Sequence, residues 1–295
     1  MDVGLTSSDC EKASAKPVAV LRCVFVARPN AFSAFLADWL AQRTQLLAVI
    51  SADTDRETWG WRYRWFSRSR KRYGLLSSLD RALFRGWCLL SREMSEGWKT
   101  MIADIKRACP VPAAEPAERL TVSSINAPEV EALLARLQPD LLFTNCIAER
   151  MAPRIFQQPT WGTLVYREGV TPEYRGVHSV FWALANGDDD MVGYSLLKAD
   201  DQLDAGHVYA QGSIRIDPLA NPMGYVGHWA LYEGLPDVER VLRDLQHGRA
   251  VPLPPRPGLD RYFSYFPLSG LLRIRRRRAA RGLPWLVTRR TSTVP

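Results

Sequence analysis

Few side chains of this chain can exchange a proton near neutral pH, because only four of its 295 residues are histidines. His178 follows a Tyr-Arg-Gly triplet by two residues, and His207 directly follows Gly206, so both are candidate general bases. The alternative, which is the more frequent one for histidine, is a structural role with a hydrogen bond. His228 and His247 fall in segments with helical periodicity, and we expect both to be structural.

Arg167 and Asp204 are the charged residues best placed for chemistry. An arginine stays protonated at any accessible pH, so Arg167 cannot be a general base, but it can stabilise an oxyanion or bind a carboxylate or phosphate. The alternative is an ion pair between Arg167 and Asp204 that only joins two loops. The local pattern predicts a strand over 163–167, a loop, a helical segment from Val177, a strand over 191–199, an acidic turn and a strand over 207–216.

The stretch 161–211 resembles the formyltransferase family, the folate-dependent enzymes that move a formyl group from 10-formyltetrahydrofolate to an amine. The residues that carry the resemblance are Pro172, Tyr174, Arg175 and Gly176 in the loop, Trp182 to Leu184 and Asn186-Gly187 after it, and Asp204 and Gly206 in the acidic turn. The resemblance covers about 18–250 and is strongest over 138–211. It implies the family's α/β fold.

The sequence departs from the family at two catalytic positions on the strand before this loop. Counting back from Pro172, Val165 stands where the family has an asparagine, and Arg167 stands where it has a histidine. Residues at i and i+2 of a strand point to the same face, so the geometry is kept while both functional groups are lost. The resemblance implies that Asp204 orients and tunes the missing histidine.

The resemblance also implies the binding residues. Folate contacts are expected from Asn145, Cys146 and Ile147, where a strand ends, and from Ala199, Asp200 and Leu203 near the acidic turn. Substrate contacts are expected from Tyr174, Arg175 and Gly176. Independently of the family, ligands of open α/β sheets bind at the carboxyl ends of the strands. The catalytic candidates are Asp204, Arg167, His178 and His207, and no residue pattern indicates a metal site.

Composition sets the broad class. The chain is 46% hydrophobic, enough for a core of domain size. Its five cysteines are scattered without C-x-x-C spacing, which favours reduced thiols and a cytoplasmic protein without a signal peptide. The net charge of +8 comes from two local clusters, over 61–107 and over 273–281. Two local clusters do not indicate a nucleic-acid-binding protein.

Hydrophobic periodicity predicts an open, mostly parallel, Rossmann-like sheet with flanking helices. A buried strand over 18–27, a helix capped by Asn30 and a strand over 45–50 form a βαβ opening. We expect a disordered leader over 1–16, an α/β domain over 17–250 with a basic helical insertion at 61–107, and a proline-rich stop with an arginine-rich tail over 251–295.

The basic insertion allows three interpretations: helices packed on their own domain, a membrane-surface helix, or a nucleic-acid patch. The packed insertion is the most frequent of these. The arginine-rich tail is expected to be solvated, with contact to anionic lipid as the alternative.

Three functions remain open. The first is a folate-dependent formyltransferase that acts on a small amine, such as an amino sugar, sugar nucleotide or amino acid derivative. The second is other acyl-transfer or hydrolytic chemistry in the same pocket, and the third is a non-catalytic binding protein. Only about forty residues follow the proline-rich stop, which argues against a tRNA substrate.

Overall fold

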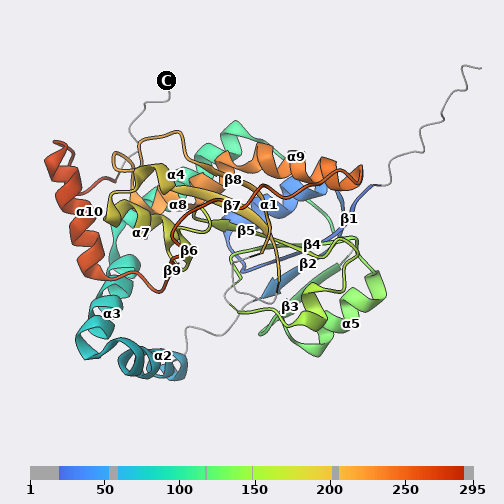
Figure 1. The fold of residues 1–295 in the computed structure, drawn as a ribbon, viewed down its shortest axis with the longest axis horizontal. Helices are drawn as coiled ribbons and strands as arrows, with labels where there is room; N and C mark the ends of the chain where they lie inside the picture. Colours follow the sequence, from blue (N-terminus) through green and yellow to red (C-terminus); the bar gives the residue numbers. More distant parts are fainter. Residues whose placement is uncertain (1–19, 53–58, 117, 148, 201–205, 289–295) are drawn as a thin grey trace, which may run out of the picture.

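A seven-stranded sheet forms the centre of the computed structural model, which describes residues 20–52, 59–116, 118–147, 149–200 and 206–288 (Figure 1). The strand order is β3-β2-β1-β4-β5-β7-β8. The strands are β1 (Arg22–Ala27), β2 (Gln45–Ala52), β3 (Glu118–Val122), β4 (Leu141–Asn145), β5 (Thr163–Glu168), β7 (Gly193–Lys198) and β8 (Val208–Ser213). The first five run parallel, while β7 is antiparallel to β5 and to β8. The predicted fold class is confirmed.

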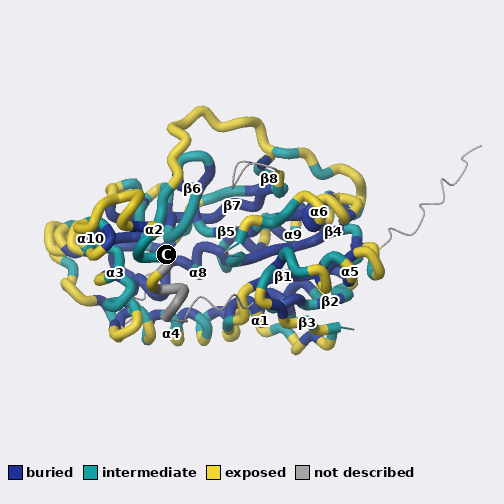
Figure 2. The backbone as a smooth tube through the Cα atoms, turned by 90° about the horizontal axis from the view of Figure 1, so that it is seen from below, coloured by how far each residue is buried: buried dark blue, intermediate teal, exposed yellow. Residues whose placement is uncertain are grey.

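Helices cover both faces of the sheet. One face carries α1 (Ala31–Ala41), α4 (Arg92–Ala108), α8 (Met223–Glu233) and α9 (Leu235–Gln246), and the other carries α5 (Pro128–Leu137) and α6 (Pro153–Phe156). Asn30 caps α1 as the sequence predicts, because its side chain accepts a hydrogen bond from Ser33 N. The central strands β1, β4, β5 and β7 are mostly buried, whereas the edge strands β3 and β8 are largely half-buried or exposed (Figure 2).

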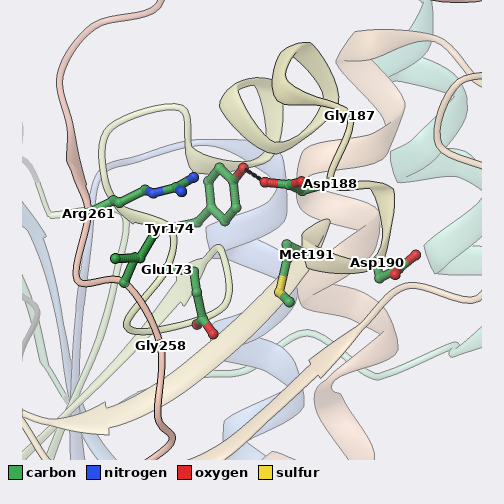
Figure 3. Close-up of a pocket in the computed structure, with 9 residues that line it drawn as sticks. Glu173, Tyr174, Gly187, Asp188, Asp190, Met191, Gly258 and Arg261 are labelled. Carbon is green, nitrogen blue, oxygen red and sulfur yellow. Dashed lines mark hydrogen bonds between the residues drawn. The ribbon is translucent and has the colours of Figure 1, made fainter.

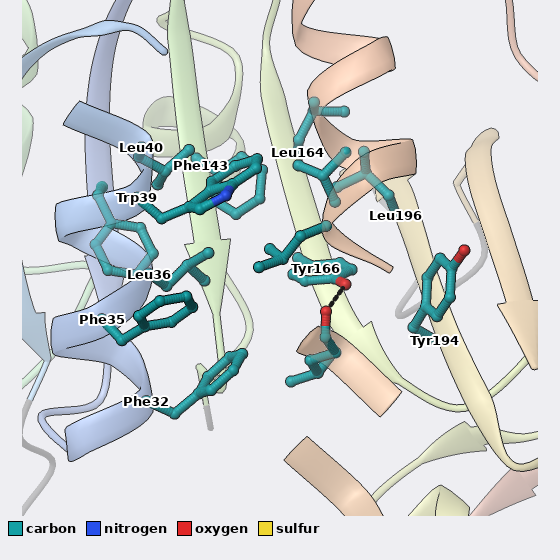
Figure 4. Packing of buried hydrophobic residues seen from close by; sticks show 14 of the residues in the cluster. Phe32, Phe35, Leu36, Trp39, Leu40, Phe143, Leu164, Tyr166, Tyr194 and Leu196 are labelled. Carbon is teal, nitrogen blue, oxygen red and sulfur yellow. Dashed lines mark hydrogen bonds between the residues drawn. The ribbon is translucent and has the colours of Figure 1, made fainter. Parts of the chain in front are cut away.

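The largest core cluster lies between the sheet and α1, α8 and α9. Phe32, Leu36 and Leu40 of α1 are fully buried and meet Phe143 of β4 and Tyr166 of β5 (Figure 4). The Tyr166 hydroxyl donates a hydrogen bond to the Leu231 carbonyl of α8, so its one polar atom is satisfied inside the core. This contact helps to fix α8 across β5.

The basic segment predicted as an insertion forms three helices, α2 (Trp59–Tyr73), α3 (Leu75–Leu90) and α4. Met101 and Ile105 of α4 are fully buried in the main core. α4 lies very close to α8, since a Cβ on Gly224 would stand 2.1 Å from the Met94 carbonyl oxygen. The α4 part of the segment is therefore packed on its own domain.

The residues expected to form a solvated tail instead form α10 (Leu268–Ala280), which packs on α3 and α7 (Ser179–Asn186). A second small sheet pairs β6 (Arg175–Gly176) with β9 (Tyr262–Phe263). Arg275 and Arg278 of α10 are buried, because both pair with Glu93 of α4. The expectation of a solvated arginine tail is wrong for these two residues, and periodicity could not reveal it because the partner lies about 180 residues away.

No helix among the described residues is long and apolar enough to cross a bilayer. The expected leader at 1–16 lies outside the described residues.

Candidate functional site at the carboxyl edge of the sheet

The parallel strands β1 and β4 end at the same level, beside Tyr166 of β5, and we call this boundary the carboxyl edge. The last register pairs are Ala27 with Asn145 and Asn145 with Tyr166. The next residues along the three strands are Arg28, Cys146 and Arg167. A thiol and two guanidinium groups thus start from neighbouring strands, about 4.8 Å apart between strand axes.

Arg167 is 9% exposed and holds the loop that follows its own strand. Its Nη2 donates to the Gly176 carbonyl at 2.8 Å and to the Ser179 hydroxyl at 3.0 Å. Its Nη1 donates to the Tyr174 carbonyl at 3.3 Å. The guanidinium therefore positions the Tyr-Arg-Gly loop and the start of α7. Val165, two residues earlier, pairs with Thr144 and Leu197 and offers only a half-buried apolar side chain.

On the other face of β5, Glu168 lies beside His228 of α8. His228 Nδ1 is 3.2 Å from Glu168 Oε1, and its Nε2 is 3.8 Å from Cys146 Sγ. Alternation along β4 would point Cys146 away from α8. The left-handed backbone of Cys146, with φ of 55°, breaks this alternation and turns the thiol towards the histidine.

Burial controls the ionisation of these three groups. It raises the pKa of the Cys146 thiol to about 12, with the Glu168 charge acting in the same direction. It lowers the pKa of His228 to about 4 and raises the pKa of Glu168 to about 7, against the effect of Arg167. At neutral pH the group contains a thiol, a neutral imidazole and a carboxyl near its midpoint.

The Tyr174 loop forms one wall of a cavity of about 360 Å³ (Figure 3). Its lining includes the acidic residues Glu173, Asp188 and Asp190, together with Arg261 from the carboxyl-terminal part of the chain. The Tyr174 hydroxyl donates to Asp188, and burial followed by this bond raises the pKa of Tyr174 to about 12. Glu173 Oε2 is buried and has no hydrogen-bond partner among the described residues. Such a lining suits a cationic group.

Arg175 and Gly176, both expected to bind substrate, lie in the β6–β9 pairing. Arg175 Nη2 pairs with Asp260 Oδ1 at 2.6 Å. Gly176 has φ of 97°, and a Cβ there would lie 2.1 Å from the Phe263 carbonyl oxygen. The glycine is therefore required by the close approach of two backbones.

The structure separates the expected folate residues into two groups. Asn145, Cys146 and Ile147 lie at the carboxyl edge, as expected. Ala199 lies at the opposite end of β5, where its N–H donates to the Thr163 carbonyl at 2.8 Å, and Asp200 follows it. Five residue steps separate Thr163 from Glu168, about 17 Å along the strand. Leu203 and Asp204 lie outside the described residues.

The two histidines proposed as bases do not meet at this edge. His178 accepts a hydrogen bond from Phe266 N at 3.2 Å through Nδ1 and packs against Phe84 and Phe181. Burial and the charge of Arg85 lower its pKa to about 4. His207 is exposed at the start of β8 and its carbonyl pairs with Lys198 N, near the amino end of β5.

His228, which the sequence predicted to be structural, is the histidine at the carboxyl edge. Helical periodicity placed it on a helix, but nothing local indicated which strand end that helix crosses. Cys146 and Glu168 could be associated from the sequence, because each stands where a strand of the parallel sheet ends. Among the described residues, no group of three or more His, Cys, Asp or Glu side chains has the arrangement of a metal site.

Comparisons with known proteins find a family that is similar to this part of the chain. Residues 95–225, which include β4, β5, the loop and the start of α8, match the family model described as formyl transferase. This part of the chain is similar to the formyl transferase family.

Among the curated proteins similar to this part of the chain, a methionyl-tRNA formyltransferase of Dehalococcoides mccartyi is 31% identical over 116 residues, 37% of each chain. The human cytosolic 10-formyltetrahydrofolate dehydrogenase is 26% identical over 127 residues, 43% of this chain and 14% of that protein. The chain thus matches well under half the length of these relatives.

Solved structures with a similar arrangement include a sugar N-formyltransferase from a Shewanella species, with 10% identity, a TM-score of 0.49 and coverage of 83% of this chain and 76% of that chain. HypX from Aquifex aeolicus in complex with tetrahydrofolic acid has 15% identity, a TM-score of 0.49 and coverage of 86% of this chain and 31% of that chain.

Proposed function

We propose that the protein transfers a formyl group from 10-formyltetrahydrofolate to the amine of a small molecule, such as an amino sugar, a sugar nucleotide or an amino acid derivative. The observation that carries the proposal is the intact loop. Arg167, which replaces the family's histidine, holds the carbonyls of Tyr174 and Gly176 and the hydroxyl of Ser179. A loop preserved and fixed in this way supports a ligand-binding role.

The end of β4 offers backbone groups that are chemically suited to the folate donor. The backbone groups of Cys146 and Ile147 lie beyond the last register pair, and both residues are partly exposed. Such groups can offer the N–H donors and carbonyl acceptors that a pteridine ring requires. When bound, the donor supplies an activated formyl group. Ala199 and Asp200 do not converge on this position, so we assign them no contact with the donor.

The acidic cavity beside Tyr174 is our candidate for the acceptor. Its volume of about 360 Å³ lies in the range of small-molecule sites. Glu173, Asp188 and Asp190 would attract a protonated amine, which must lose its proton before it can attack a formyl carbon. The acidic lining suits an amino compound better than a polyanion such as tRNA.

Calorimetric titration with tetrahydrofolate tests the donor part of the proposal. Micromolar binding would support it, and absence of binding up to millimolar ligand would refute it. With binding established, incubation with 10-formyltetrahydrofolate and amino sugars, sugar nucleotides or amino acids tests the acceptor by mass spectrometry of the formamide product. Release of formate alone, with no acceptor modified, would favour the hydrolytic alternative instead.

A further inference from the structure

A transfer of a formyl group to an amine needs a group that accepts a proton, and β5 offers none at the usual positions. Val165 has no polar side-chain atom, and Arg167 cannot lose its proton. On the neighbouring strand β4, Cys146 contacts His228, which in turn contacts Glu168. These three residues come from the end of β4, from α8 and from the end of β5.

We propose that Cys146, His228 and Glu168 form a thiol–imidazole–carboxylate relay, in which Cys146 takes the formyl group as a thioester before the amine receives it. The inference rests on the proposed formyl transfer. In the first step the Cys146 Sγ–carbon bond forms and the carbon–N10 bond of the donor breaks, while the thiol proton passes through His228 Nε2 to N10. In the second step the amine attacks the thioester carbon, the sulfur leaves, and the amine proton returns to sulfur through His228. The net products are tetrahydrofolate and a formamide.

The geometry meets the requirements of such a relay. Glu168 Oε1 lies 3.2 Å from one ring nitrogen of His228, and the other ring nitrogen faces the thiol, whose proton it can accept. Because the thiol and the carboxylate contact opposite nitrogens, the three side chains cannot converge on one metal ion. The His228 and Glu168 side chains keep 20% and 23% of their surface exposed, so a small molecule can reach them.

The imidazole is held in this orientation by aromatic rings. Trp98 of α4 meets it edge-on with ring centroids 4.5 Å apart, and Phe32 of α1 does so at 5.2 Å. A Cβ on Gly227 would lie 2.8 Å from Glu168 Oε1, so the glycine beside His228 lets α8 approach the carboxylate. The non-glycine left-handed conformation of Cys146 is the type of backbone strain that recurs at functional sites.

The first experiment mixes the protein with 10-formyltetrahydrofolate in the absence of an acceptor and measures the intact mass after an acid quench. We expect an increase of one formyl group, located in the peptide that contains Cys146. Cys146→Ala should lose the adduct, while Cys109→Ser should keep it. Tetrahydrofolate binding with no adduct in the wild type would overturn the relay and leave the proposed function standing.

An aryl ester tests the relay even if folate does not bind. We expect p-nitrophenyl acetate to acylate Cys146 in the wild type, with release of nitrophenolate. His228→Asn should slow this acylation by about 100-fold or more, the usual contribution of a general base. His247→Asn is the matched control, because His247 is exposed at the end of α9. Acylation no faster in the wild type than in Cys146→Ala would refute the relay whatever the folate result.

The pH profile separates a relay from a merely structural contact. The charged and titratable groups around Glu168 and Cys146 are His228 on α8, Arg167 on β5, which lowers the pKa of Glu168, and Arg28 after β1, which lowers the pKa of Cys146. Ionised Glu168 stabilises the imidazolium that forms during proton transfer, so the acylation rate should rise through about pH 7. Glu168→Gln should remove this rise. A rise that persists unchanged in Glu168→Gln would contradict the role of Glu168 as a positioning residue.

A second inference concerns α3. Its solvent side carries six exposed leucines with exposed fractions of 43–87%, namely Leu75, Leu76, Leu79, Leu83, Leu89 and Leu90. At 100° per residue the six fall within about 140° of arc, and buried Phe84 lies opposite. Exposed apolar faces of this kind mark interaction sites.

We infer that this leucine stripe rests on an anionic bilayer surface. Residues 70–76 are all exposed and place Arg70, Lys71 and Arg72 directly before the first two leucines. A basic turn that continues into an apolar helix face is the arrangement of interfacial helices. Basic residues near anionic lipid add to the attraction.

Sedimentation with lipid vesicles tests this surface. The protein should pellet with vesicles that contain phosphatidylglycerol and much less with pure phosphatidylcholine, and added salt should weaken the binding. Leu76→Asp with Leu83→Asp should abolish pelleting, whereas Leu259→Asp, at an exposed leucine elsewhere, should not. If the wild type is a dimer that does not bind vesicles, and the double variant is a monomer, the stripe is an interface between copies of this chain. In that case the lipid inference fails.

Discussion

At the residue scale, Arg167 shows how one buried side chain can hold a whole loop. Its guanidinium has more donors than an imidazole and satisfies the carbonyls of Tyr174 and Gly176 together with the Ser179 hydroxyl. A shorter side chain could not span all three. Arg167 therefore attaches the loop to the strand that precedes it.

Arg167→Met should lower the free energy of unfolding by about 2–4 kcal/mol, because it leaves buried carbonyl oxygens without donors. Urea denaturation measures the change. Arg154→Met is the control: Arg154 pairs with Glu131 at the surface, and its loss should change stability by no more than about 0.5 kcal/mol. Equal effects of the two substitutions would show that Arg167 does not hold the loop.

Because His178 is buried, we expect the stability of the fold to depend on pH. Its pKa is lowered from 6.5 to about 4 in the folded protein by burial and by Arg85. As the pH falls, His178 takes up a proton in the unfolded chain before it does so in the folded protein. Its contribution to the free energy of unfolding is therefore complete above pH 6.5 and is lost as the pH falls towards 4. Glu168 acts in the opposite sense, since its raised pKa stabilises the fold below about pH 4.5 and this contribution is lost towards pH 7. His178→Gln should reduce the loss of stability between pH 6.5 and 4 by about 1–3 kcal/mol, measured by thermal unfolding at each pH. An unchanged acid limb would contradict the burial of this imidazole.

At the scale of elements, a buried charge cluster joins α4 to α10. Glu93 is fully buried, and its carboxylate accepts from Arg275, from Arg278 at 2.7 Å and from Met223 N at 3.2 Å. Arg278 also donates to the Leu219 and Asn221 carbonyls. These directional contacts fix the position of α10 on the domain more precisely than a purely apolar contact would.

Glu93→Gln should cost about 3–5 kcal/mol of unfolding free energy, because two buried guanidinium groups then lack a counter-charge. Glu96→Gln, one helical turn further along α4, removes an exposed partner of Lys99 and should cost less than about 0.5 kcal/mol. Chemical denaturation of the two variants side by side measures the difference. A loss for Glu93→Gln as small as that of the control would show that the cluster does not anchor α10.

At the scale of the whole molecule, the sequence is informative where structure depends on near neighbours. The strands, the cap at Asn30 and the Tyr-Arg-Gly loop follow from patterns shorter than about ten residues. The pairing of His228 with Glu168 depends on how α8 crosses β5, sixty residues away, and no local pattern encodes that crossing. The arginines of α10 look solvated in sequence for the same reason, since Glu93 lies in a distant helix. The residues that the sequence predicts to bind folate lie in two separate places. Ala199 follows the antiparallel strand β7, which carries it to the other end of β5.

The acidic cavity takes one wall from Glu173 and Tyr174 and another from Gly258, Leu259 and Arg261. Arg175 and Gly176 meet Tyr262 and Phe263 in the β6–β9 pairing, which joins the two walls. During synthesis on the ribosome, the sheet and its loop can assemble well before residue 258 leaves the exit tunnel. The cavity is therefore completed only after residue 261 has emerged, and a nascent chain can be folded at its centre while the cavity still lacks its second wall.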